Sequence, residues 1–156
     1  MKNILITGAA SGIGRRLVST LAARGDAVFA TDVSGDSLRK AAEEEGWVAR
    51  TVRIEVLDVR KEEDWSRAVA QFLYGFGPLD VLVNSAGVVR PASIDRLSAG
   101  SIDLEVDVNL KGVMLGCKSV SAAMIEQGHG HIVNIAWFAA LAPVPGIDVY
   151  SATKFG

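Results

Sequence analysis

Residues 3–14 read NILITGAASGIG, a short apolar run that passes directly into a glycine-rich turn. The run predicts a buried strand, and the apolar spacing after it predicts a helix that begins at the turn. The three glycines let the chain turn tightly, approach a ligand and pack the helix against the strand. Free N–H groups at such a helix start suit a pyrophosphate, although an ordinary strand-to-helix turn is the alternative. The residues expected to contact a nucleotide are Gly8, Ser11, Gly12, Ile13 and Gly14.

The same change of hydrophobic period recurs along the chain. Short apolar runs, typical of buried strands, alternate with apolar residues three and four apart, typical of one helix face. This alternation predicts a parallel sheet covered on both faces, in one α/β domain spanning residues 1–156. The strands are expected at residues 3–7, 27–31, 48–57, 79–83 and 131–136, and the helices at about 13–25, 36–45, 65–76 and 102–124.

Composition excludes several classes of protein. The chain has 156 residues, 49% of them hydrophobic and 22% charged, with a net charge of −2. It lacks the roughly 20 consecutive apolar residues of a membrane span and the basic blocks typical of nucleic-acid binding. A single cysteine, Cys117, fits a reducing cytoplasm. His129 and His131 have no third histidine beside them, so we expect a turn there and no metal site.

The second apolar run is followed by Asp32, which lies 18 residues beyond Gly14. A carboxylate at this point accepts hydrogen bonds from both hydroxyls of an adenosine ribose and repels a 2′-phosphate. Residues 33–35 contain no Arg or Lys that would neutralise such a phosphate. The sequence therefore favours NAD over NADP; the alternative is that Asp32 merely caps the next turn.

Several ordered motifs resemble those of the short-chain dehydrogenase/reductase family, across essentially the whole chain. Residues 7–14 are similar to its TGxxxGxG fingerprint, and residues 150–154 to its YxxxK pair. The resemblance implies a Rossmann-like doubly wound sheet that binds NAD and transfers hydride between it and a small secondary alcohol or its ketone. The other site residues that the resemblance implies are Asp58, which contacts adenine, its neighbour Val59, the cleft residues Asn84, Ala86 and Gly87, and Asn109.

The resemblance gives Tyr150 and Lys154 the acid–base chemistry. A free tyrosine has a pKa near 10, so acting as a base near pH 7 requires about 4 kcal/mol of phenolate stabilisation. A lysine four residues later lies on the same helix face, where its ammonium favours the phenolate. By resemblance, Lys154 also holds the nicotinamide ribose, and Asn109 supports a water that relays protons. Outside this context, a tyrosine four residues before a lysine is an ordinary surface pair.

Two features depart from the family pattern. The family has a serine 13 residues before its tyrosine that donates to the substrate oxygen, and Trp137 stands at that position. Losing one such donor typically costs about 10²–10³ in rate. The chain also stops at Gly156, whereas family members continue through this helix and two more strands. We expect a helix this short to hold Tyr150 and Lys154 poorly, and the fifth strand to be an uncovered edge.

These departures leave two functional hypotheses open. The first is an NAD-dependent short-chain oxidoreductase. The alternative is a non-catalytic or impaired NAD-binding module that acts through binding or interaction. By resemblance the chain forms a homo-oligomer through its fourth and fifth helices, and the short fifth helix predicts an altered assembly.

Overall fold

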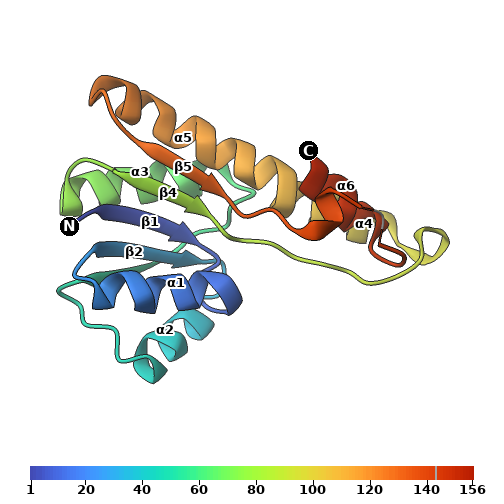
Figure 1. Ribbon diagram of the computed structural model, residues 1–156, viewed down its shortest axis with the longest axis horizontal. Helices are drawn as coiled ribbons and strands as arrows, with labels where there is room; N and C mark the ends of the chain where they lie inside the picture. Colours follow the sequence, from blue (N-terminus) through green and yellow to red (C-terminus); the bar gives the residue numbers. More distant parts are fainter. Residues whose placement is uncertain (143) are drawn as a thin grey trace.

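Five short apolar segments pair into one parallel sheet in the order β3-β2-β1-β4-β5 (Figure 1). The computed structural model describes residues 1–142 and 144–156. β1 is central because Leu5 lies opposite Phe29 of β2 on one side and Leu82 of β4 on the other. This is the strand order of a doubly wound Rossmann sheet, so the predicted fold class is confirmed. The strands are β1 (Asn3–Thr7), β2 (Ala27–Asp32), β3 (Val52–Val56), β4 (Val81–Asn84) and β5 (His131–Asn134).

Helices cover both faces of the sheet (Figure 1). Alternate side chains of β1 point to opposite faces. Leu5 packs with Trp65 and the other apolar residues of α3 and α5, whereas Ile4 and Ile6 pack with Val18 and the apolar residues of α1 and α2. Within the described residues, none of the helices combines the length and apolar character needed to cross a membrane. The helices are α1 (Gly12–Ala23), α2 (Gly35–Glu44), α3 (Glu62–Phe76), α4 (Ala99–Val106), α5 (Gly112–Glu126) and α6 (Asp148–Phe155).

The carboxyl ends of β1 and β4 are tied together by one threonine. The hydroxyl oxygen of Thr7, the last residue of β1, accepts hydrogen bonds from the N–H groups of Ser85 and Ala86, each at 3.1 Å. β1 continues into α1 on one face, while the segment after β4 leads to the helices on the other face. In open α/β sheets, ligands bind where the connections after two neighbouring strands run to opposite faces of the sheet.

The long helix predicted over residues 102–124 contains an irregular turn. α4 is followed by a π-helical turn, η2 (Asp107–Lys111), before α5 begins. The N–H of Gly112 bonds to the carbonyl of Asp107, five residues back, as in a π-helix. This turn buries the side chain of Asn109, which is 3% exposed.

Three predicted strand boundaries differ from the structure by two residues or more. β3 begins at Val52, not at residue 48, because the N–H groups of Thr51 and Val52 both bond to the Val48 carbonyl and close a turn. β4 begins two residues later than predicted, at Val81. β5 ends two residues early, at Asn134, although it lies at the edge of the sheet as expected.

The expectation that the last helix would be poorly held is also wrong. α6 forms two turns, because tertiary contacts replace the length that an isolated helix needs. Thr153 on its inner face is 4% exposed and accepts a hydrogen bond from Asn109 Nδ2 at 3.2 Å. Just before the helix, the carbonyl of Gly146 accepts from the N–H of Ala92 at 2.9 Å. These contacts connect α6 to η2 and to the loop that follows β4.

Candidate active site

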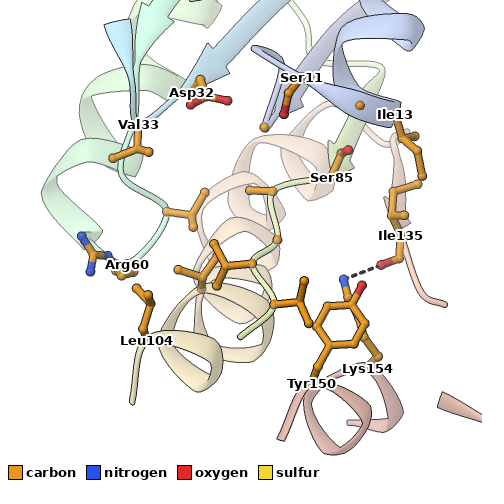
Figure 2. Close-up of a pocket in the computed structure, with 18 of the residues that line it drawn as sticks. Ser11, Ile13, Asp32, Val33, Arg60, Ser85, Leu104, Ile135, Tyr150 and Lys154 are labelled. Atoms are coloured by element: carbon orange, nitrogen blue, oxygen red, sulfur yellow. Dashed lines mark hydrogen bonds between the residues drawn. The ribbon is translucent and has the colours of Figure 1, made fainter. Parts of the chain in front are cut away.

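A cavity of about 530 Å³ lies at the carboxyl ends of the strands. Figure 2 shows Ser11 and Asp32 on one side of it and Tyr150 and Lys154 on another. Three predicted site residues, Gly14, Asn84 and Asn109, are not part of the lining. The predicted residues that do line the cavity are Gly8, Ser11, Gly12, Ile13, Asp32, Asp58, Val59, Ala86, Gly87, Tyr150 and Lys154.

Two of the glycines in the turn are required by close packing. A Cβ on Gly8 would lie 2.7 Å from the Cα of Ala86, and one on Gly14 would lie 2.2 Å from the carbonyl oxygen of Gly8. Gly12 differs, since a Cβ there would meet nothing within 4 Å, although its φ of +53° favours glycine. The turn is therefore packed tightly against the segment that follows β4, and it is open toward the cavity at Gly12.

The start of α1 fits a diphosphate. Ser11 is its N-cap residue, yet the Ser11 side chain makes no capping hydrogen bond. In α2, by contrast, the side chain of Ser34 accepts from the N–H of Ser37. The first N–H groups of α1 are thus left for a ligand, at the positive end of the helix dipole and beside the open face of Gly12.

Asp32 both lines the cavity and holds the glycine turn. Its Oδ2 accepts from the N–H of Ala10 at 3.1 Å, and its Oδ1 accepts from the N–H of Ser34 at 3.0 Å. Asp32 therefore does cap the next turn, as the alternative interpretation held, through its bond from the Ser34 N–H. A carboxylate has about four acceptor positions, so two remain for a ribose.

Asp58 is engaged by a residue that the sequence reasoning missed, Arg60. Asp58 Oδ1 accepts from Arg60 Nε at 2.8 Å and from the Arg60 backbone N–H at 3.1 Å. Asp58 Oδ2 accepts from Arg60 Nη2 at 2.6 Å. These bonds lower the pKa of Asp58, chiefly through the guanidinium. The signal in the sequence was the position of Arg60, two residues after Asp58 at the end of a strand.

The two predicted asparagines do not line the cavity, but their hydrogen bonds hold the segments that do. Asn84 Nδ2 donates to Asn134 Oδ1 at 2.9 Å and so joins β4 to β5. Asn109 bonds to both backbone groups of Val88, with its Oδ1 accepting and its Nδ2 donating at 2.8 Å each. A Cβ on Gly87 would lie 3.5 Å from Asn109 Oδ1 and 3.7 Å from Lys154 Nζ, so these two side chains converge there.

A second missed residue, Glu105, holds the same loop. Glu105 is 1% exposed, and its Oε1 accepts from the N–H of Arg90. It precedes Asn109 by four residues, so the two side chains fasten neighbouring parts of one loop to one helical segment. The signal was an acidic residue within the apolar stripe of a predicted helix.

Tyr150 and Lys154 lie on one face of α6, as predicted, and Lys154 also bonds to the backbone just after β5. Lys154 Nζ donates to the carbonyl of Ile135 at 2.8 Å, and it lies 5.7 Å from the centre of the Tyr150 ring (Figure 2). Burial, and secondly the charge of Glu105, raise the pKa of Tyr150. Burial lowers the pKa of Lys154. The chain alone therefore leaves Tyr150 as a neutral phenol at pH 7.

Comparisons of sequence and of structure with known proteins both match this chain to dehydrogenases. Residues 2–156 match the family model described as short chain dehydrogenase. The chain is 36% identical to 2-(R)-hydroxypropyl-CoM dehydrogenase of Xanthobacter autotrophicus, over 96% of this chain and 62% of that protein. It is 37% identical to D-threitol dehydrogenase of Mycolicibacterium smegmatis, over 99% and 60%. It therefore spans about three fifths of the length of these curated relatives.

A solved structure also matches over nearly the whole chain. The crystal structure of serine dehydrogenase from Escherichia coli superposes with a TM-score of 0.88 at 31% identity. The superposition covers 97% of this chain and 69% of that one.

Proposed function

The chain belongs to the short-chain dehydrogenase family, and on this basis we propose that it binds NAD(H) for hydride transfer between a secondary alcohol and its ketone. One observation carries the proposal. A single cavity joins the uncapped N-terminus of α1, which suits a diphosphate, to Tyr150 and Lys154 at its other end. A dinucleotide that spans this cavity brings its reactive ring next to a proton-transfer group.

Asp32 supports NAD over NADP. Its carboxylate lines the cavity with two acceptor positions left for ribose hydroxyls, and it would repel a 2′-phosphate. Residues 33–35, which follow it, carry no basic side chain.

The proposed chemistry assigns a proton-transfer role to Tyr150. A bound nicotinamide ring supplies the acceptor or donor of the hydride. In the direction that forms the ketone, the phenolate oxygen of Tyr150 would take the hydroxyl proton of the alcohol, and in the reverse direction the Tyr150 phenol would return it. Because the chain itself raises the pKa of Tyr150, the positive charge of the oxidised cofactor and of Lys154 must stabilise the phenolate. Asn109 holds the loop at Val88 and, we propose, a water of the proton relay.

A second candidate is an NAD-binding module without catalysis. The observation that favours it is Trp137, which lines the cavity beside Tyr150 at the position of the family's serine. The indole adds bulk where the carbonyl of a substrate should approach.

Calorimetric titration tests the cofactor proposal. We expect heat from NADH and much weaker binding of NADPH, and we expect Asp32→Asn to reduce the preference by about tenfold or more. Tighter binding of NADPH by the unaltered chain would contradict the assignment.

Turnover separates the two candidate functions. NADH formation from a panel of secondary alcohols that disappears in Tyr150→Phe supports the enzyme. Binding of NADH without turnover, with partial rescue by Trp137→Ser, supports the module.

We further propose that residues 1–156 act as one nucleotide-binding unit that self-associates, with a cytoplasmic location that its single cysteine fits. Exposed apolar side chains on α5 support self-association, since Met114 is 58% and Ile125 79% exposed. Light scattering should give a mass above the 16.5 kDa of one chain. A mass equal to that of one chain would contradict self-association.

A further inference from the structure

Asp58 and Arg60 line the cavity as a hydrogen-bonded pair, and Figure 2 shows Arg60 at the end away from Tyr150 and Lys154. Given the proposed cofactor, we propose that Arg60 withdraws Asp58 from base recognition, so that the site tolerates changes at the C6 amino group of the purine. The inference rests on the proposed function, because it assumes that a dinucleotide binds in this cavity.

The hydrogen bonds of Asp58 carry the inference. Its two carboxylate oxygens accept three hydrogen bonds from Arg60, at 2.6, 2.8 and 3.1 Å. About four acceptor positions exist on a carboxylate, so most of its capacity is used. The side chain of Asp58 is only 10% exposed, which limits the approach of any further donor. A ligand amine must therefore compete with a charge-assisted, forked pair.

The surroundings of Arg60 offer contact to a flat ring. Figure 2 places Arg60 at the same end of the cavity as Val33 and Leu104, away from Tyr150 and Lys154. Arg60 is more exposed than its partner, with 39% of its side chain accessible. A guanidinium held in a fixed position stacks well on aromatic faces, and every purine has such a face. Apolar contact and stacking do not discriminate between an amino group and a carbonyl at C6.

The charge balance argues against a phosphate at this end. The positive charge of Arg60 is matched by Asp58 at 2.6 Å, so it is not free to neutralise a 2′-phosphate. Asp32 also lines the cavity and adds a negative charge. Arg60 therefore does not convert the site to NADP.

Calorimetry with NADH and its 6-oxo analogue, nicotinamide hypoxanthine dinucleotide in reduced form, tests the inference. The measured quantity is the ratio of the two affinities. Arg60→Leu frees the Asp58 carboxylate to accept from the adenine amine, so we expect the ratio to rise about tenfold in favour of NADH. Arg60→Lys keeps the charge but loses the fork, and we expect an intermediate ratio.

Arg67→Leu is the matched control. Arg67 is likewise paired with an aspartate, Asp64, at 2.7 Å, but it does not line the cavity. This variant should leave the ratio unchanged. Circular dichroism and thermal unfolding confirm that each variant is folded before titration.

Each outcome decides the question. A ratio that Arg60→Leu leaves unchanged, or a ratio that Arg67→Leu raises equally, overturns the inference. Failure of the unaltered, folded chain to bind either dinucleotide overturns the proposed function itself, and the inference with it. A rise confined to the two Arg60 variants supports it.

Discussion

The indole ring of Trp137 stands edge-on to the phenol ring of Tyr150, with centroids 5.7 Å apart and planes at 70°. Such aromatic pairs contribute about 0.5–1.5 kcal/mol beyond the burial of their surface. Half of Trp137 remains exposed, and both rings line the cavity. The pair therefore holds the indole beside the Tyr150 ring, where the proposed substrate would approach the Tyr150 hydroxyl.

Replacing Trp137 with serine should increase turnover of secondary alcohols. Trp137→Ser removes the bulk beside Tyr150 and restores a hydroxyl donor, which is worth about 10²–10³ in rate. The same change should lower the free energy of unfolding by about 1 kcal/mol, because the aromatic contact is lost. Steady-state NADH formation and urea unfolding measure the two effects. Trp137→Phe, which keeps a ring but restores no donor, should not gain activity, and an equal gain there would contradict the explanation.

The ionisation of Tyr150 should depend on the cofactor. Burial and Glu105 raise its pKa in the chain alone. In a Tyr74→Phe background Tyr150 is the only tyrosine, so its phenolate can be followed by ultraviolet absorbance. We expect the midpoint to lie above pH 10 in the chain alone and to fall when NAD⁺ is bound. A midpoint that does not move on saturation with NAD⁺ would exclude the proposed electrostatic activation.

Gly14→Ala should destabilise the fold and weaken NADH binding. Its Cβ would lie 2.2 Å from the carbonyl oxygen of Gly8, so the turn must shift. Overpacking of this kind typically costs about 1–3 kcal/mol. Gly100→Ala is the control, since a Cβ on this glycine in α4 would meet nothing within 4 Å. It should be neutral or slightly stabilising, and equal destabilisation of both variants would show that the packing is not responsible.

Stability should fall in acid through the aspartates around the Asp58 turn. Arg60 lowers the pKa of Asp58, and Arg67 lowers that of Asp64. The folded state thus binds fewer protons, and the stability that these groups contribute is present above their unfolded pKa of about 3.8. It is lost as the pH falls through the lower folded values. Urea unfolding from pH 7 to pH 3 measures this loss. Asp64→Asn should flatten the acid limb, and an unchanged pH dependence would rule out a contribution from Asp64.

Part of the site was predictable because it depends on local sequence. The glycines of the turn, Asp32 at the end of β2, and Tyr150 four residues before Lys154 are all features of spacing. The structure brings all of them except Gly14 into the lining of one cavity. The roles of these residues in catalysis and cofactor binding stay predictions.

Other features of the fold and the site depend on contacts between segments that are distant in the sequence. The start of β3 between residues 48 and 57 was not predictable, because the turn at Val48 and the strand at Val52 have similar apolar character. The buried position of Glu105 follows from the loop after β4, whose Arg90 N–H bonds to it. A hydrophobic pattern contains no information about that partner.

The sequence by itself determined the order of strands and helices, the glycine turn and the family, because hydrophobic period and glycine spacing act over a few residues. Tertiary structure alone decided that α6 is folded, that Lys154 bonds to Ile135 and that Trp137 lies against Tyr150. These outcomes depend on the packing of segments distant in the chain, whose contacts supply the free energy that a two-turn helix lacks by itself.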